Sequence, residues 1–304
     1  MNILVTGACG QLGCMIRSIA PGSRHRFIFA DIAEAEGLET LRLDVTDEAA
    51  LRRVAEQEAV EVIVNCAGYT NVDGAESEPE LAERLNAAAP ALMARIMQER
   101  GGLLIHPSTD YVFGGEPHCT PYDESQPCSP LGIYGISKLH GEQAIRAAGG
   151  SYVILRTAWL YSPYGRNFLR TMLQLTAQRP RLQVVSDQTG TPTYALGLAQ
   201  TILHIVDDYG KHPSGPYPRS GIYHYTDEGV CSWYDFAQMI ATMAGHRQCD
   251  ICPCHSADYP TAATRPSYSV LDKTKIKKTF GIRIPHWTDS LRECLGTMGY
   301  GCGA

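Results

Sequence analysis

The first half of the chain alternates short apolar runs with longer stretches in which apolar residues recur every three or four positions. The apolar runs lie at residues 3–5, 27–30, 41–43, 62–64, 103–105 and 153–155. Helical patterns lie between them, at residues 11–19, about 46–55, about 79–100 and 134–147, with Thr46 as the expected N-cap of the second. Continuous apolar strands separated by helices are typical of a parallel sheet with helices on both faces. The pattern therefore predicts an α/β fold with a Rossmann-type, doubly wound parallel sheet.

After about Trp159 this rhythm loosens, and Pro and Gly become frequent at residues 212–218. Shorter strand and helix signals continue at residues 182–185, 194–208, 222–225 and 232–243. No clean linker and no internal repeat separates the halves. We therefore expect a second, smaller C-terminal α/β domain, with some late segments returning to the first sheet. The first domain is expected to span residues 1–158 plus about 184–220, and the second about 159–183 plus 221–304.

Composition and charge narrow the classes of function. Hydrophobic residues make up 44% of the 304 residues, which can bury a sizeable core and rules out a disordered chain. The net charge is −6 and no block of like charges occurs, which argues against a nucleic-acid partner. No apolar run approaches the ~18 residues of a membrane-spanning helix, and the first residues lack the pattern of a signal peptide. We therefore expect a cytoplasmic protein that does not enter a membrane.

A glycine-rich turn follows the first apolar run and opens a helical pattern. Residues 6–13 read TGACGQLG, with Gly7, Gly10 and Gly13 spaced G-x-x-G-x-x-G. Glycines let the backbone approach a diphosphate, and the free N–H groups at the helix start then bind the anion. In this strand–turn–helix context the turn predicts a dinucleotide site, against the alternative of an ordinary glycine-rich turn.

Acidic and small residues at the ends of the next strands fit the same site. Asp31 ends the second strand, where a carboxylate can bind the ribose hydroxyls of NAD, although a solvated strand end would look the same. Asp44 and Val45 follow the third strand and could face the adenine. Residues 65–68 (NCAG) end the fourth strand, where small side chains would let the backbone pass close to a cofactor.

A third motif carries candidate catalytic groups. Residues 106–113 (HPSTDYVF) follow the fifth strand, and ligands sit beyond the carboxyl ends of strands in open α/β sheets. Tyr134 and Lys138 are spaced i and i+4 and share one helix face. A nearby ammonium lowers the pKa of a tyrosine, so Tyr134 could exchange a proton with a carbonyl or alkoxide oxygen near neutral pH. Thr109 could hydrogen-bond the same oxygen.

Together these motifs resemble the extended short-chain dehydrogenase/reductases and, more narrowly, the dTDP-4-dehydrorhamnose reductase family. The matching stretches span most of the chain in order: residues 6–13 (TGACGQLG), 65–76 (NCAGYTNVDGAE), 108–113 (STDYVF), 122–142 (YDESQPCSPLGIYGISKLHGE), 155–161 (LRTAWLY), 165–169 (GRNFL), 184–193 (VVSDQTGTPT) and 265–272 (RPSYSVLD). The run 65–76 and the pairing of STDYVF with YGISK are the most specific.

The resemblance implies transfer of a hydride from NADPH or NADH to C4 of a 4-keto-6-deoxyhexose carried on dTDP. It implies that Tyr134 donates the proton, that Lys138 lowers the tyrosine pKa and holds the nicotinamide ribose, and that Thr109 binds the keto oxygen. The first domain would then bind NAD(P) and the second the nucleotide sugar. Implied cofactor positions are Gly7, Gly10, Gln11, Leu12, Gly13, Asp31, Asp44, Val45, Cys66, Ala67 and Gly68, and implied substrate positions include Asp110 and Trp159.

The chain also departs from the family and carries weaker signals. Gly68 replaces the usual Ala, Pro107 stands where a larger residue is common, and one extra residue lies in the loop 114–121. Asn167 and Arg265 present donors that could hold the diphosphate. The alternatives are a helix cap for Asn167 and a surface ion pair for Arg265.

The chain has eleven cysteines, which we expect to be mostly small buried hydrophobes in a reducing compartment. Cys249, Cys252, Cys254 and His255 resemble zinc-ligand spacing. The resembled family has an apolar strand in this region. We therefore expect no metal, and a strand over 251–254 that turns Cys252 and Cys254 to one face.

Other functions remain open beside the reductase. One is another nucleotide-sugar reductase or epimerase, because the motifs determine hydride chemistry better than the sugar. Another is a non-catalytic protein like the methionine adenosyltransferase regulatory subunit, which the intact Thr109, Tyr134 and Lys138 argue against. The preferred cofactor also stays open, as does the choice between monomer and homodimer.

Overall fold

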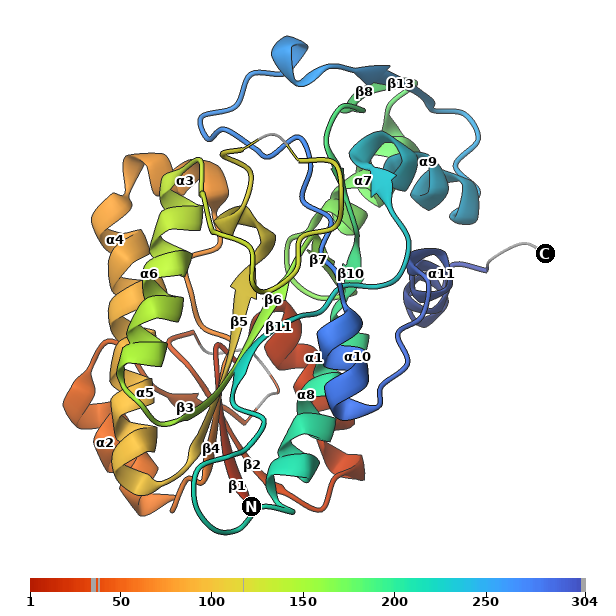
Figure 1. Cartoon of the computed structure of the whole chain (residues 1–304). Helices are drawn as coiled ribbons and strands as arrows, with labels where there is room; N and C mark the ends of the chain where they lie inside the picture. Colours follow the sequence, from red (N-terminus) through yellow and green to blue (C-terminus); the bar gives the residue numbers. More distant parts are fainter. Residues whose placement is uncertain (34–36, 38, 117, 302–304) are drawn as a thin grey trace.

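A seven-stranded parallel sheet forms the centre of the larger lobe (Figure 1). The computed structural model of the chain describes residues 1–33, 37, 39–116 and 118–301. The strands run in the order β11-β6-β5-β4-β1-β2-β3. Their bounds are β1 Asn2–Thr6, β2 Arg26–Asp31, β3 Leu41–Arg42, β4 Val62–Asn65, β5 Leu103–Thr109, β6 Ser151–Thr157 and β11 Gly221–His224. Strands β1 to β3 follow one another toward one edge of the sheet, and β4, β5, β6 and β11 follow one another toward the other edge. The strand order therefore switches between β1 and β4, and the predicted Rossmann-type sheet is confirmed.

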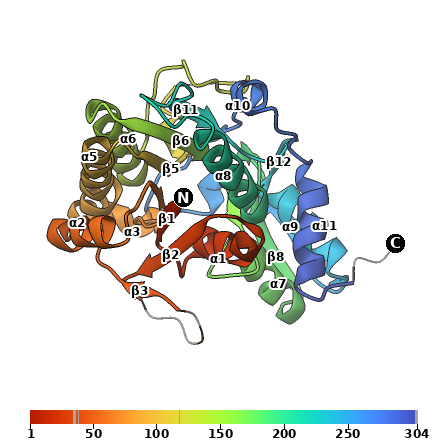
Figure 2. The same cartoon turned by 90° about the horizontal axis from the view of Figure 1, so that it is seen from below.

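Helices cover both faces of this sheet, as Figure 2 shows. α1 (Gln11–Ile19) and α8 (Ala195–Tyr209) lie on one face, and α2 (Glu48–Gln57), α5 (Ala89–Arg100) and α6 (Ile133–Ala147) on the other. Successive strand residues serve opposite faces: Ile3 and Val5 join the core under α1 and α8, whereas Leu4 joins the core under α2 and α5. Continuous apolar strands are therefore required, because both faces are buried.

Two details of the helices differ from the predictions. The cap of α2 is Asp47, whose carboxylate accepts from Ala50 N at 3.0 Å, while Thr46 instead donates to Asp44. The expected helix over 79–100 is interrupted, as α4 (Pro79–Glu83) passes through a π-helical turn, η2 (Arg84–Ala88), before α5. α3 (Val72–Ser77) precedes it, and a single-turn 3₁₀ helix, η1 (Ala20–Gly22), follows α1.

The smaller lobe lies beyond the carboxyl ends of the strands in Figure 1. Its strands form three short pairs, β8 (Arg181–Val185) with β13 (Asp250–Cys254), β7 (Leu160–Tyr161) with β10 (Thr193–Tyr194), and β9 (Thr189–Gly190) with β12 (Cys231–Ser232). The later helices are α7 (Phe168–Gln178), α9 (Trp233–Met243), α10 (Thr274–Phe280) and α11 (Trp287–Thr297), and the remaining 3₁₀ turns are η3 (Asp110–Val112) and η4 (Ser256–Asp258).

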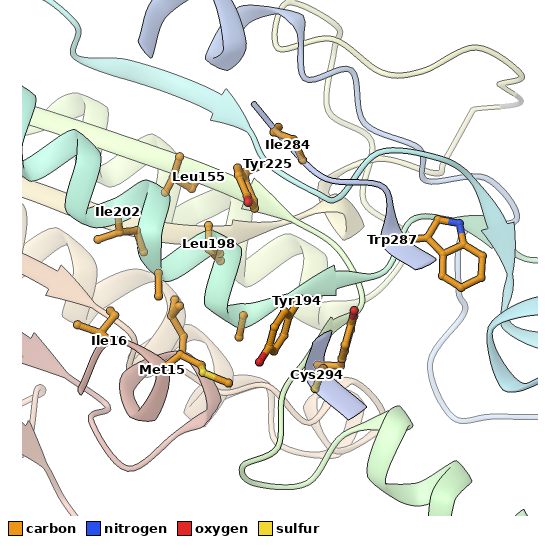
Figure 3. Close-up of a cluster of buried hydrophobic side chains, with 14 of the residues drawn as sticks. Met15, Ile16, Leu155, Tyr194, Leu198, Ile202, Tyr225, Ile284, Trp287 and Cys294 are labelled. Carbon is orange, nitrogen blue, oxygen red and sulfur yellow. The ribbon is translucent and has the colours of Figure 1, made fainter. Parts of the chain in front are cut away.

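One hydrophobic core runs from the sheet into the smaller lobe. Figure 3 shows Met15 of α1 and Leu198 of α8 continuing through Tyr194 to Cys294 and Trp287 of α11. The two lobes are thus packed together through shared apolar side chains. Among the described residues, no helix combines the length and apolar character needed to cross a bilayer.

Strand pairing places two segments differently from the expected division of the chain. β11, at 221–224, pairs with β6 at the edge of the large sheet, although these residues were expected in the second domain. Residues 184–185, expected in the first domain, belong to β8 and pair with β13. The apolar pattern predicts that both segments are strands, but it carries no information about which neighbour each will pair with.

Candidate active site

The glycine-rich turn joins β1 to α1 and admits no side chain at two of its glycines. Gly7 has φ +64°, and a Cβ there would lie 2.5 Å from Ala67 N. A Cβ on Gly13 would lie 2.5 Å from the carbonyl oxygen of Gly7. Gly10 is the N-cap of α1 and has no side chain that could accept a hydrogen bond from the first backbone N–H groups of the helix. A turn that excludes Cβ atoms beneath an open helix N-terminus fits a dinucleotide diphosphate.

The residues predicted for the adenosine side lie at the end of β2 and after β3, and Asp31 contacts the glycine turn directly. Asp31 ends β2 and accepts from Cys9 N at 2.8 Å and from Ala33 N at 3.0 Å. Asp44 accepts from the backbone and hydroxyl of Thr46, which lowers the pKa of its carboxyl. Val45 and Leu12 are buried in the two cores on opposite faces of the sheet.

The small residues after β4 lie against the glycine turn. Cys66 and Ala67 supply the backbone atoms that a Cβ on Gly7 would meet. Burial raises the pKa of the Cys66 thiol. Gly68 leaves room for Asn86, since a Cβ on Gly68 would lie 3.0 Å from Asn86 Oδ1.

The candidate catalytic residues meet at the carboxyl end of β5. Thr109 is the last residue of β5 and is buried, with its hydroxyl donating to Asp110 Oδ1 at 3.1 Å. Tyr134 lies in the first turn of α6, and its ring meets the Tyr111 ring edge-on, with centroids 5.5 Å apart. Lys138 lies one turn later and is buried. Thr109, Tyr134 and Lys138, which the sequence associates only through their motifs, therefore lie close together in the structure.

The direction of the Tyr134 pKa differs from the expectation. Burial raises the pKa of Tyr134 to about 12, while its hydrogen bond with Thr109 lowers it in part. Lys138 does not lower this pKa, because its Nζ binds the carbonyl oxygen of Pro107 at 2.7 Å and His106 Nε2 at 3.2 Å. A phenol with such a pKa stays protonated at neutral pH and is available as a proton donor.

Burial acts in the same sense on two other ionisable groups at this end of β5, Lys138 and Asp110. It lowers the pKa of Lys138 to about 8, against the opposing field of Glu142. It raises the pKa of Asp110 to about 6, although the hydroxyls of Ser269 and Thr109 lower it in part. Each shift favours the uncharged form, so this end of β5 is a poorly solvated environment.

Trp159 stands after β6 in a strained conformation. Its φ is +47°, a value rarely adopted by bulky side chains. Its ring stacks on Trp233 of α9 with centroids 3.6 Å apart, and it covers Gly190, where a Cβ would lie 2.7 Å from the indole. Aromatic stacking thus fixes an indole at the boundary of the two lobes.

The two residues proposed at the diphosphate have partners within the chain. Asn167 is the N-cap of α7, and its Nδ2 donates to Gln11 Oε1 at 2.9 Å. Arg265 forms a bidentate ion pair with Asp73, with N–O distances of 3.1 and 2.7 Å. The cap and the ion pair are therefore both present, and a diphosphate role for either residue stays a prediction.

The cysteine-rich segment forms β13, as predicted. Cys254 is buried, whereas Cys252 is half-exposed and its thiol lies 3.2 Å from Arg181 Nε, so the two cysteines lie in different environments. Cys249 is half-buried beside the core, and His255 faces Asp187. Within the described part of the chain, no group of three or more His, Cys, Asp or Glu side chains is placed to hold a metal ion.

Several polar residues of the site were not identified from the sequence. Asn86 sits in the π-helical turn, where its amide donates to Tyr69 O and to Ser137 Oγ. An Asn inside a long apolar helical pattern is the signal that could have marked it. His106 and Asn65 also lie within quoted motifs, but their contact with each other depends on strand order, which the sequence does not reveal.

Comparison with known proteins finds relatives that match nearly the whole chain. The family model of the RmlD substrate binding domain matches residues 1–299. A dTDP-4-dehydrorhamnose reductase of Burkholderia thailandensis is 37% identical, over 97% of this chain and 98% of its own. A probable dTDP-4,6-dihydroxy-2-methyloxan-3-one 4-ketoreductase of Streptomyces antibioticus is 38% identical, over 96% of this chain and 94% of its own.

A solved structure of a relative named as a dTDP-4-dehydrorhamnose reductase has the same fold as this chain. The dTDP-4-dehydrorhamnose reductase of Bacillus anthracis, solved in complex with NADP, superposes with a TM-score of 0.85. It is 32% identical and covers 97% of this chain and 99% of its own. With the fold, the glycine turn and the family model in agreement over nearly the whole length, the chain belongs to the RmlD substrate binding domain family.

Proposed function

We propose that this protein reduces the C4 keto group of dTDP-4-dehydro-L-rhamnose to give dTDP-L-rhamnose, with NADPH or NADH as the reductant. The proposal is supported mainly by one observation: Thr109, Tyr134 and Lys138 lie together at the end of β5, two strands from the glycine turn. Relatives named for this reaction match the chain over nearly its whole length. The Bacillus anthracis relative holds NADP, which supports use of a nicotinamide cofactor here.

The glycine turn and the ends of β2 and β4 would hold the cofactor. Gly7 and Gly13 let the turn pack closely against the end of β4 and against itself, and a diphosphate would bind at the N-terminus of α1 that follows this turn. Asp31 would accept from the adenosine ribose, and Ala67 would lie along the cofactor beside Gly7. When bound, the reduced nicotinamide supplies a hydride.

Tyr134 would complete the reduction by protonating the substrate oxygen. A ketone that gains a hydride on carbon becomes an alkoxide, and one proton converts it to a hydroxyl. Tyr134 is a neutral phenol at neutral pH, so it can give that proton and become a tyrosinate. Thr109 would hold the same oxygen, and Lys138 would hold the ribose of the nicotinamide.

Residues from both lobes would hold the sugar nucleotide. Trp159, fixed by Trp233, presents an indole against which a sugar ring can pack. Asp110 is buried beside Thr109 and could accept from a sugar hydroxyl. Arg265 and Asn167 remain candidates for the diphosphate.

A second candidate differs only in the sugar. The Streptomyces antibioticus relative is as similar as the rhamnose reductases, and its name describes the ketone of another dTDP-sugar. Reduction of such a ketone would use the same residues, so only the identity of the substrate distinguishes the two candidate functions.

The test is an assay with the purified protein and either NADPH or NADH. dTDP-4-dehydro-L-rhamnose is made in situ by the preceding enzymes, and the product is identified by chromatography and NMR. We expect oxidation of the cofactor with stoichiometric formation of dTDP-L-rhamnose. Turnover of another dTDP-ketosugar alone would support the second candidate. If no dTDP-ketosugar led to oxidation of NADPH or NADH, the proposal that the protein is a reductase would be wrong.

A further inference from the structure

A loop of the smaller lobe, residues 162–167, packs against the first residue of α1. Gln11 begins α1 directly after the glycine turn. Gly165 of the loop has φ +64° and comes so near that a Cβ on it would lie 3.3 Å from Gln11 Cγ. Asn167, which ends the loop and is the N-cap of α7, lies with its Nδ2 2.9 Å from Gln11 Oε1. The loop therefore covers one side of the Gln11 side chain across the boundary of the two lobes.

Backbone groups determine which way the Asn167 amide points. Its Nδ2 lies 2.8 Å from the carbonyl oxygen of Ser162 and 3.1 Å from that of Tyr164. Its Oδ1 lies 3.1 Å from the backbone nitrogen of Arg170. A carbonyl oxygen can only accept and a backbone N–H can only donate, so exchanging the oxygen and nitrogen of this amide would break all of these bonds. The atom of Asn167 that faces Gln11 is therefore a donor.

The orientation of the Gln11 amide follows from that of Asn167. The atom that faces Asn167 Nδ2 must accept, so it is Oε1, and the NH₂ group of Gln11 faces the other way. The hydroxyl of the buried Ser162 lies 3.2 Å from the same oxygen. Within the described part of the chain, Gln11 Nε2 has no hydrogen-bond partner, and it is not fully buried. An unpaired donor of known orientation therefore lies at the N-terminus of α1.

We infer that Asn167 is a positioning residue for the cofactor: it orients the Gln11 amide so that the NH₂ group donates to the diphosphate of the nicotinamide cofactor. The backbone N–H groups at a helix N-terminus already attract such an anion, and the Gln11 amide adds a side-chain donor to them. A side chain that is ordered before binding loses less conformational entropy when the ligand arrives. The inference deepens the cofactor side of the proposed function and does not depend on which sugar is reduced.

The N-cap role of Asn167 is separate from this positioning role. The cap uses only Oδ1, which accepts from Arg170 N, and a serine hydroxyl can accept in the same way. The positioning role uses only Nδ2, which serine lacks. Asn167→Ser therefore keeps a capping oxygen and the neutral charge but removes the donor that faces Gln11.

The binding test combines Asn167→Ser with Gln11→Met, and it measures the Kd for NADPH of the full chain by fluorescence titration. Met has nearly the length of Gln but no strong donor or acceptor. We expect Gln11→Met to raise Kd by ~10- to 100-fold, as for loss of a hydrogen bond to a charged group. Asn167→Ser should raise Kd by ~3- to 10-fold, because Gln11 must then be ordered on binding. In the Gln11→Met background, Asn167→Ser should cause no further rise.

Asn71→Ser is the matched control for the loss of an asparagine cap. Asn71 is the N-cap of α3 and accepts from Gly74 N at 3.1 Å, as Asn167 accepts from Arg170 N. This variant should leave the Kd for NADPH unchanged. An unchanged Kd in Asn167→Ser would overturn the inference. An equal rise with Gln11 and with Met at position 11 would also overturn it, because Asn167 would then act without Gln11.

NMR of the side-chain amides tests the orientation directly. The signals of the Asn167 and Gln11 NH₂ groups are assigned by their loss in Asn167→Ser and Gln11→Met. We expect the Asn167 NH₂ protons to exchange slowly with water in the free protein. The Gln11 NH₂ protons should exchange rapidly in the free protein and slowly when NADPH is bound. Rapid exchange at Asn167, or a Gln11 signal that NADPH does not protect, would contradict the inference. Neither measurement uses a ketosugar, so its failure is distinct from failure of the reductase assay.

Discussion

Burial sets the protonation states around Tyr134. The pKa of Tyr134 rises to about 12, that of Asp110 rises to about 6 and that of Lys138 falls to about 8. Each shift favours the uncharged form, since all three side chains have lost water. A charge that develops on a substrate oxygen here would therefore meet fixed donors in a poorly solvated site, where electrostatic stabilisation is strong.

Asp31 offers a prediction about the choice of cofactor. Its carboxylate ends β2 and would accept from a free ribose 2′-hydroxyl but repel a 2′-phosphate. In Asp31→Ala we expect kcat/KM with NADH to fall by ~10- to 100-fold, as for loss of a hydrogen bond to a charged group, and to fall much less with NADPH. The measurement is the ratio of the two kcat/KM values. Asp47→Ala, which removes only the cap of α2, is the control.

An equal loss with both cofactors would give Asp31 a different role. Its two oxygens already accept from Cys9 N and Ala33 N. The carboxylate would then only brace the glycine turn and would not distinguish NADH from NADPH.

Some residues of the candidate site can be predicted from local sequence patterns, and others cannot. Tyr134 and Lys138 share a helix face, and Thr109 ends an apolar run, so local spacing together with the glycine turn predicts them as candidates for one site. The contacts of Asn65 with His106, and of Arg265 with Asp73, join strands and loops far apart in the chain. Such contacts follow from strand order and lobe packing, which local spacing does not contain.

At the scale of elements, the joint between β1 and α1 depends on backbone proximity. The glycine turn lies directly against the end of β4, and a Cβ on Gly7 would lie 2.5 to 2.6 Å from Cys66 and Ala67 backbone atoms. Backbone atoms cannot move aside as a flexible side chain can. The turn, the strand end and the helix start are therefore one rigid unit that positions the expected diphosphate site.

This joint predicts that Gly7→Ala is far more damaging than a matched change at Gly101. Gly101 has φ +66° at the end of α5, nearly the φ of Gly7, but its Cβ would meet no atom within 4 Å. We expect Gly101→Ala to lose ~1–2 kcal/mol of unfolding free energy through backbone strain. Gly7→Ala should lose more and should also abolish cofactor binding. Urea unfolding and fluorescence titration with NADPH check both, and equal effects would show that contact with β4 is unimportant.

Element types were more predictable than element partners. The apolar runs predict β1, β4, β5 and β6, because strands buried on both faces have no polar alternation. The signal at 222–225 also predicts a strand, and it overlaps β11 at 221–224, but it does not predict that β11 pairs with β6. The cap of α2 was placed one residue early, since Thr46 and Asp47 are both good capping residues and only the geometry selects Asp47.

At the scale of the whole molecule, the two lobes share one core and several polar contacts across their boundary, such as that of Asn167 with Gln11. The core under α1 and α8 extends to α9 and α11 (Figure 3). Arg265 also joins Asp73 of α3, a helix that packs against α6. The sequence predicted two lobes but not their exact boundaries, because segments such as β11 return to the large sheet after leaving it.

A buried carboxyl in this shared core makes stability depend on pH. Burial raises the pKa of Asp227 to about 7, although the backbone N–H of Tyr194 lowers it in part. A raised folded-state pKa means that the contribution to stability is fully present below pH ~4 and is lost as pH rises through about 7. We expect Asp227→Asn to be more stable than the unmodified protein at pH 8, by a few kcal/mol at most, and to differ little at pH 4–5.

Urea unfolding at pH 5 and pH 8 measures this difference. Asp250→Asn, on an exposed strand end, is the matched control for exchanging a carboxylate for an amide outside the core. A difference between Asp227→Asn and the unmodified protein that is the same at both pH values would mean that Asp227 does not take up a proton on folding.

The central claim is that Tyr134 donates the proton in a nicotinamide-dependent reduction. Its most direct test compares kcat of Tyr134→Phe with that of the unmodified protein at saturating dTDP-4-dehydro-L-rhamnose, together with the Kd for NADPH. We predict an unchanged Kd and a kcat lower by ~10²- to 10⁴-fold, the usual contribution of a positioned general acid. Near-normal turnover without the phenol hydroxyl would contradict this account of the site.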